Sequence, residues 1–126
     1  LSRIMLAIKT VLADSDDIPT LIFDEIDTGI SGRTAQKVAE KLAVISRNHQ
    51  VICITHLPQI AAMADCHFEI KKSTDGESTK TRINRLKEDE TVTELARLLG
   101  GVQITDAVLQ NASEMKKLAK QTKKYR

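Results

Sequence analysis

The sequence predicts an α/β fold in which a mostly parallel sheet is flanked by helices and followed by a β-hairpin. Two short apolar runs, residues 20–23 and 51–55, are too brief for helices and are typical of strands buried on both faces, as in parallel sheets. Helical patterns alternate with these runs, which favours a layered α/β unit. A polar stretch at 73–79 separates two further strand patterns and indicates the hairpin.

The first half of the chain alternates helices and strands. Apolar residues at helix-face spacing predict an amphipathic helix over residues 1–13, ended by Asp14 to Asp17 and by Pro19. Ser31 is a suitable N-cap for a second helix over 32–47. The inward face of that helix is expected to be Ala35, Val38, Ala39, Leu42 and Ile45. After the second strand, Pro58 suits the first turn of a short helix that runs to about Met63.

The second half is predicted to be the hairpin followed by two helices. Residues 66–72 and 80–86 form the two strands, and the polar stretch between them is expected to be a mobile tip. One helix covers about 91–99 and stops at two glycines, and the last covers about 105–120. We expect residues 1–126 to form a single unit. Because the sequence begins without Met and enters a helical pattern at once, this unit is expected to be a fragment of a longer protein.

The composition excludes several classes of protein. Of the 126 residues, 41% are hydrophobic and 29% are charged, which excludes a disordered tail and a membrane protein. Aromatic residues make up only 2%, so a base-stacking nucleic-acid platform is disfavoured. There is no leader-like start, no apolar run near the ~20 residues of a membrane span, and no disulfide framework. We therefore expect a cytoplasmic location.

The excess positive charge lies at the C-terminal end. Residues 113–126 contain six lysines and arginines and one acid. These cations could contact DNA phosphates, but a charge run at a chain end is more often a solvated helix face, which we favour here. Arg82, Arg85 and Lys87 near the hairpin are interpreted in the same way.

Two Cys and His pairs are weak candidates for zinc ligands. Cys53 and His56 are three apart along a strand, and Cys66 and His67 are direct neighbours. Side chains at these spacings point to opposite faces of a strand, so convergence on one tetrahedral ion would need a sharp bend. Cys53 is expected to be a buried core thiol.

The strongest candidates for chemistry come directly after the two central strands. Asp24 and Glu25 follow the first strand, and His56 follows the second. Ligands of such sheets bind beyond the carboxyl ends of the strands. Asp24 would hold Mg²⁺, which prefers oxygen ligands, and Glu25 would polarise a water that attacks a γ-phosphate. The alternative interpretations are ordinary solvated acids and a structural histidine.

The loop from Asp27 to Ser31 connects the acids to the next helix. It contains an acid and a glycine, a combination that suits close approach of another backbone. The alternative interpretation is a plain strand-to-helix connector.

Three segments in order resemble the RecN family of SMC-like, ABC-type ATPases. Leu-Ile-Phe-Asp-Glu at 21–25 resembles a Walker B strand, and Ile-Thr-His at 54–56 resembles the switch-histidine loop. Residues 24–32, 54–61 and 94–101 look like the corresponding stretches of this family, and the start of the chain resembles the region just after the ABC signature. The resemblance covers nearly the whole chain and implies the C-terminal lobe of a P-loop NTPase head.

The resemblance implies a role for each residue of the site. Asp24 would be the Mg²⁺ acid, Glu25 the catalytic base and His56 the γ-phosphate sensor. Residues 26–31, which include Asp27 and Ser31, would be the D-loop that meets a second head across a shared ATP. Ser31 departs from the family pattern, because many relatives have an acid at the matching position.

The resemblance also implies cofactors and partners. These are ATP and Mg²⁺, an N-terminal lobe of the same protein, a second head in an ATP-sandwiched homodimer, and DNA, in recombinational repair of double-strand breaks in the bacterial nucleoid. The sequence contains neither a G-x-x-x-x-G-K-[ST] phosphate loop nor a coiled coil, so this chain alone is expected not to bind ATP tightly or hydrolyse it. The alternatives are another ABC or SMC-like head, or a non-catalytic α/β binding module.

Overall fold

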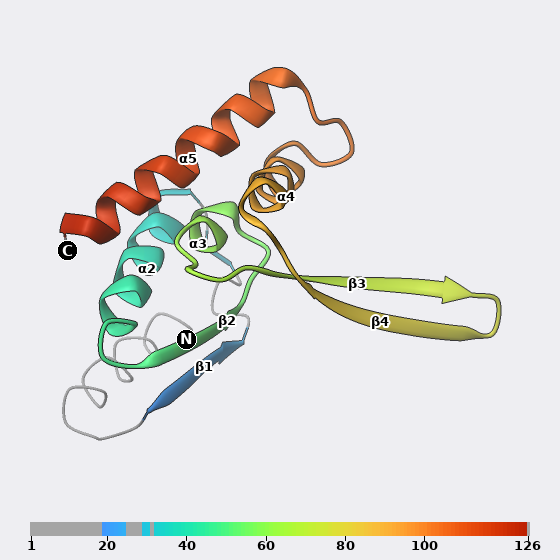
Figure 1. The fold of residues 1–126 in the computed structure, drawn as a ribbon, viewed down its shortest axis with the longest axis horizontal. Coiled ribbons are helices and arrows are strands. Elements are labelled where there is room, and N and C mark those ends of the chain that lie inside the picture. Colours follow the sequence, from blue (N-terminus) through green and yellow to red (C-terminus); the bar gives the residue numbers. More distant parts are fainter. Residues whose placement is uncertain (1–18, 25–28, 31, 126) are drawn as a thin grey trace.

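The computed structural model describes residues 19–24, 29–30 and 32–125. Figure 1 shows the elements in chain order: β1 (Thr20–Asp24), α2 (Gly32–Ile45), β2 (Gln50–Ile54), α3 (Pro58–Ala62), β3 (Phe68–Asp75), β4 (Ser78–Arg85), α4 (Glu88–Gly100) and α5 (Asp106–Tyr125). The helix expected over residues 1–13 lies outside the described residues. The predicted order of the other elements is confirmed.

The described strands form two separate two-stranded sheets. β1 and β2 pair in parallel, with Thr20 opposite Gln50 and Asp24 opposite Ile54. β3 and β4 pair antiparallel and form a ribbon that extends away from the helices (Figure 1). The predicted α/β class and the hairpin are therefore confirmed. Within the described residues, however, the parallel part of the sheet is a single strand pair.

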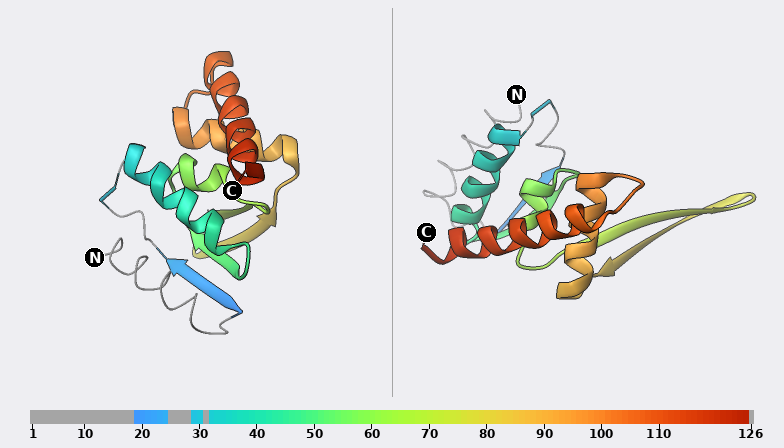
Figure 2. Two further views of the ribbon diagram at one scale, coloured as in Figure 1. Left: turned by 90° about the vertical axis from the view of Figure 1, so that its left-hand side faces the viewer. Right: turned by 90° about the horizontal axis from the view of Figure 1, so that it is seen from above.

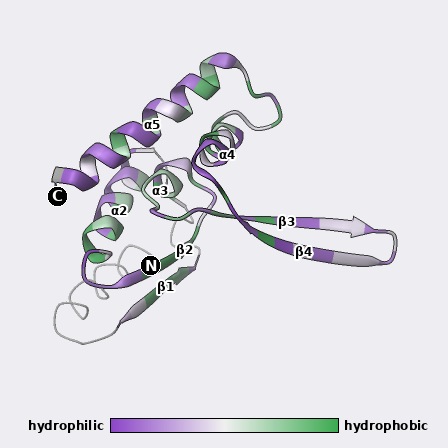
Figure 3. Cartoon of the chain, in the orientation of Figure 1, coloured by the Kyte–Doolittle hydropathy of each residue, from purple (hydrophilic) through white to green (hydrophobic). Residues whose placement is uncertain are grey.

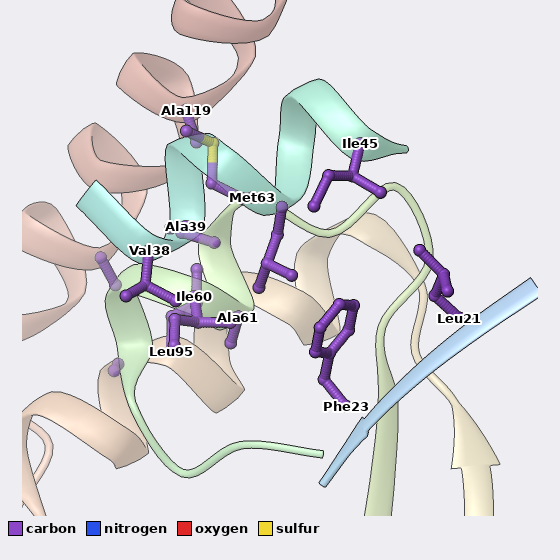
Figure 4. Packing of buried hydrophobic residues seen from close by; sticks show 14 residues of the cluster. Leu21, Phe23, Val38, Ala39, Ile45, Ile60, Ala61, Met63, Leu95 and Ala119 are labelled. Carbon is purple, nitrogen blue, oxygen red and sulfur yellow. The ribbon is translucent and has the colours of Figure 1, made fainter. Parts of the chain in front are cut away.

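One hydrophobic cluster joins β1 to the described helices, as Figure 4 shows. Leu21 and Phe23 point from β1 into this cluster, and Leu95 of α4 is fully buried in it. The predicted inward face of α2 is confirmed, because all five of its residues are buried. α5 contributes alanines to the cluster, and their small side chains allow α5 to lie close to the other helices (Figure 2).

The prediction that both central strands are buried on two faces is wrong for the described structure. Both strands are hydrophobic along most of their length (Figure 3), but Ile22, Ile52 and Ile54 are 57%, 45% and 44% exposed. In β1 the burial alternates, because successive side chains point to opposite faces of a strand. The described helices cover one face only, so each strand is half-buried. Cys53 packs against the cluster but is only partly buried, so the expectation of a buried core thiol holds in part.

The hairpin is longer than predicted. The polar residues expected to form a mobile tip instead continue the ladder as far as the pair Asp75 and Ser78. Gly76, with φ of 61°, occupies the left-handed region in the tight turn that remains. Threonines opposite each other support extended pairing even where nothing is buried, and all of β4 is exposed.

Local hydrogen bonds set the ends of α4 and α5. The Lys87 N–H donates to Glu90 Oε1 at 2.9 Å, so α4 begins three residues earlier than predicted. α4 ends at Gly100, where glycine allows α5 to approach closely. A Cβ atom at this position would lie only 3.1 Å from a methyl carbon of Val108. Thr105 Oγ1 accepts from the Val108 N–H at 3.2 Å and starts α5, which runs five residues beyond its predicted end.

Replacing Leu95 tests the core. Leu95→Ala should lower the free energy of unfolding by about 2–5 kcal/mol, because Leu95 is 0% exposed and the shorter side chain leaves a cavity. Leu118→Ala on α5 is the matched control, since Leu118 is 62% exposed and its loss should change that free energy by less than about 0.5 kcal/mol. Urea unfolding followed by circular dichroism measures both variants. Equal losses would contradict this packing.

Candidate functional site

The carboxyl ends of β1 and β2 lie side by side at one edge of the parallel pair. The register places Asp24, the last residue of β1, opposite Ile54, the last residue of β2. Thr55 and His56 continue directly from Ile54, so His56 leaves the sheet beside the end of β1. Asp24 and His56 are both exposed. The prediction that the two strands end at the same edge is confirmed.

A short turn fixes the backbone around His56. The Leu57 N–H donates to Thr55 Oγ1 at 3.0 Å, and the Leu57 carbonyl accepts from the Ala61 N–H at 3.1 Å. Leu57 is extended and Pro58 occupies the first turn of α3, as predicted. His56 is therefore positioned between a strand end and a helix start by the bonds of its neighbours.

Three predicted site residues, Glu25, Asp27 and Ser31, lie outside the described residues. Within the same loop, Gly29 has φ of 76°, a left-handed conformation that favours glycine, and Ile30 packs against the core. The structure thus brings Asp24 and the His56 turn to one edge. The individual roles of all five site residues stay predictions.

Asp24 has the chemistry of a ligand for a hard cation. Its exposed carboxylate makes no hydrogen bond or ion pair with any described residue. No group of three or more His, Cys, Asp or Glu side chains in the described ranges is arranged to hold a metal. A single carboxylate at an open sheet edge fits Mg²⁺, which keeps several waters and binds substrate phosphates as well as protein. The imidazole of His56 can exchange a hydrogen bond with a phosphate oxygen or with water.

Two lysines of α5 bind the carbonyls at the end of the helix that follows His56. Lys116 Nζ donates to Ala62 O at 3.1 Å and to Ala64 O at 2.9 Å. Lys123 Nζ donates to Met63 O at 2.9 Å. The last carbonyls of a helix have no partner within it, and these ammonium groups supply one. α5 is therefore tied to α3, and through α3 to the turn that carries His56.

The interpretation of the C-terminal cations as a solvated face is wrong for part of the set. Besides its carbonyl bond, Lys123 pairs with Asp65. Lys120 pairs with Glu88 but stays exposed, as predicted. Burial, and then the nearby charges of Lys120 and Lys123, lower the pKa of Lys116. The spacing of Lys116, Lys120 and Lys123 does place them on one helix face in the sequence, but it does not show what that face contacts.

Part of the family-like stretch 94–101 packs in the core. Glu94 is 7% exposed, and Arg97 Nε donates to both of its carboxylate oxygens at 3.0 Å. This guanidinium holds the pKa of Glu94 below its usual range, against the opposing effect of burial. Leu95 and Ala96, between them, are fully buried. This stretch thus combines two fully buried residues of the core with an ion pair between the buried Glu94 and the exposed Arg97.

Sequence comparison relates the chain to curated bacterial proteins. It is 49% identical over 123 residues to the DNA repair protein RecN of Bacillus subtilis (strain 168), covering 98% of this chain and 21% of that protein. It is 50% identical over 115 residues to RecN of Haemophilus influenzae, covering 91% of this chain and 21% of that protein. It is 39% identical over 120 residues to RecN of Streptomyces coelicolor, covering 95% of this chain and 21% of that protein. The chain thus spans about a fifth of the length of these relatives. No family model matches the sequence.

Structural comparison points to the same class of fold. A solved chain from work on ATP-driven dimerization and DNA-stimulated activation of SMC ATPases matches with a TM-score of 0.61 at 21% identity, covering 79% of this chain and 59% of that one. At this identity the likeness concerns the fold, which resembles an SMC ATPase head. Within the described ranges, each helix is too short or too polar to cross a lipid bilayer.

The link between α5 and α3 can be tested by removing one ammonium group. Lys116→Met keeps most of the aliphatic stem but leaves the carbonyls of Ala62 and Ala64 without this donor. The free energy of unfolding should fall by about 1–3 kcal/mol. Lys117→Met on the exposed side of α5 is the control and should change it by less than about 0.5 kcal/mol. If the two variants unfold at the same urea concentration, the lysine does not stabilise this contact.

The Glu94 and Arg97 pair predicts a pH dependence. Because the folded-state pKa of Glu94 lies below that of the unfolded chain, the stabilisation is present above about pH 4.5 and is lost as pH falls through the folded-state pKa. Glu94→Gln should therefore be less stable than the wild type by about 1–3 kcal/mol at neutral pH, and this deficit should shrink in acid. Urea unfolding at a series of pH values measures it. Glu114→Gln, at an exposed site on α5, should show no such convergence.

Proposed function

The chain is homologous over nearly its whole length to part of the DNA repair protein RecN, and on this premise we propose that it is the C-terminal part of an ATPase head that acts in recombinational repair of DNA double-strand breaks. The observation that carries the proposal is the register of β1 and β2, which ends the strand of Asp24 beside the strand that leads to His56. An enzyme that hydrolyses ATP needs acidic and polar groups gathered at such an edge.

Each residue of the edge has a proposed task. Asp24 would hold Mg²⁺, which supplies positive charge to the phosphates of bound ATP. The Glu25 carboxylate would accept the proton of the attacking water, and His56 would hydrogen-bond the γ-phosphate. Asp27 and Ser31, in the segment 26–31, would contact the second head across the nucleotide.

The proposed activity requires partners. The sequence contains no phosphate loop, so an N-terminal lobe of the same protein would supply the backbone amides that hold the triphosphate. A second head would complete the ATP site, and DNA would be a partner of the full-length protein, in the bacterial cytoplasm. The neighbouring SMC ATPases are described as dimerizing in an ATP-driven way and as activated by DNA, which supports these partners. The chain by itself is expected to be inactive.

Replacing Glu25 in the full-length protein tests the proposal. Glu25→Gln should slow ATP turnover by about 10²–10⁴-fold, the usual contribution of a positioned base, because the amide cannot accept the proton. ATP binding should be unchanged, since the substitution keeps the size of the side chain. Steady-state phosphate release and nucleotide binding by fluorescence measure the two properties.

Glu77→Gln, in the turn of the hairpin, provides the matched control and should leave turnover unchanged. Wild-type turnover in Glu25→Gln would remove Glu25 from the role of base. A full-length protein that shows no Mg²⁺-dependent hydrolysis at all would favour the non-catalytic α/β module instead.

A further inference from the structure

A pocket of about 340 Å³ lies among α5, the segment 62–67 and the start of α4. Neither Asp24 nor His56 is among its lining residues, so it is separate from the edge described above. The charged groups that line it come from three places in the chain. They are Arg85, Lys116, Lys120, Lys123, Asp65 and Glu88. The sequence interpretation assigned these cations to solvated surfaces.

The lining carries an excess of positive charge. Four of these groups are cations, apart from His67, and two are carboxylates. Three of the cations follow one another along a single face of α5. Burial is the main cause of the lowered pKa of Lys116, and repulsion from Lys120 and Lys123 lowers it further, against the weaker attraction of Asp65 and Glu88. The pocket therefore has a net positive field that its own acids do not cancel.

The cations of the pocket retain capacity for a ligand. The only hydrogen bond of the Arg85 guanidinium to a described residue goes to Cys66 Sγ, at 3.3 Å, and a thiol sulfur is a weak acceptor. A guanidinium has five N–H donors, and its geometry matches two phosphate oxygens at once. Most of the donors of Arg85 are thus available for an anion.

The carboxylates that pair with the lysines are held loosely. Lys120 pairs with Glu88 and Lys123 with Asp65, and the side chains of these two acids are 72% and 77% exposed. Exposed ion pairs contribute little to stability, so either acid can turn into water at low cost. A dianion that enters the pocket would replace single carboxylates at the same ammonium groups.

We propose that this pocket binds a phosphate group, held by Arg85, Lys120 and Lys123, with Lys116 as a fixed positive charge at its wall. Lys116 is fixed because its ammonium group is bonded to Ala62 O and Ala64 O. The ligand is a phosphate monoester, free phosphate or the backbone phosphate of a nucleic acid, which share this chemistry. The inference does not depend on ATP hydrolysis by the proposed head.

The test is a titration of the 126-residue chain with inorganic phosphate at constant ionic strength, followed by isothermal calorimetry and by amide shifts around the pocket. Binding should saturate and should move amides of segment 62–67 and of α5. Arg85→Gln and Lys120→Gln should each weaken it about tenfold, which corresponds to 1.4 kcal/mol. Lys117→Gln is the matched control, because Lys117 is exposed on α5 and does not line the pocket.

Glu88→Gln gives a result that loss of folding cannot imitate. Removing this carboxylate eliminates the competitor for Lys120, so phosphate should bind more tightly, by roughly threefold to tenfold. The proposal is overturned if phosphate produces no saturable change, if Lys117→Gln weakens binding as much as Lys120→Gln, or if Glu88→Gln weakens it.

A final arm of the experiment separates the two sources of phosphate. Short duplex DNA is added to the phosphate-loaded chain at the same ionic strength. Release of bound phosphate by DNA, at a DNA concentration that rises about tenfold in Arg85→Gln, supports the proposal with a nucleic-acid backbone as the source. Retention of phosphate supports it with a small phosphorylated ligand as the source.

Discussion

The parallel register of β1 and β2 is the constraint on which the rest of the structure depends. Side chains alternate along a strand, so a slip of one residue would turn Leu21 and Phe23 out of the core and Ile22 into it. Phe23 is only 2% exposed, and its burial against the helices makes such a slip costly. The same register aligns Asp24 with Ile54. Hydrophobic packing on one side of the sheet thereby decides which polar residues meet at its edge.

The C-terminal helix links the core to this edge. Alanines of α5 reach the core cluster, while Lys116 and Lys123 bind the carbonyls of Ala62 and Met63 at the end of α3. α3 begins two residues after His56, and the lysines that bind the end of α3 lie 52 to 60 residues beyond the carbonyls that accept their hydrogen bonds. The same lysines surround the pocket with its excess of positive charge. One helix face thus combines an apolar contact, a helix cap and a binding surface for anions.

Local sequence patterns predicted the helices and strands well, but they predicted the contacts between distant segments less well. The buried face of α2 follows from helical spacing, and the turn at Leu57 and Pro58 follows from the restricted backbone of proline. The hairpin itself was predicted, but the extension of its strands to Asp75 and Ser78 was missed, because these polar residues carry no burial signal and cross-strand pairing alone supports them. At the candidate site, the two strand ends were predictable because strands of a parallel pair end at one edge. The contacts of the lysines with carbonyl groups were not predictable. The spacing of lysines along a helix is the same in the sequence whether their side chains contact water or a carbonyl.

The sequence by itself determined the order of the described helices and strands, the inward face of α2, the polar residues that follow the two strands and the resemblance to RecN-like ATPases. These properties depend on neighbours a few residues apart, where the geometry of the backbone sets the spacing. Only the tertiary structure decided that β1 and β2 are covered on one face, that Lys123 caps Met63 sixty residues away and that four cations gather around one pocket. Burial and electrostatic pairing of this kind join distant segments, and no local period in the sequence records which segments meet.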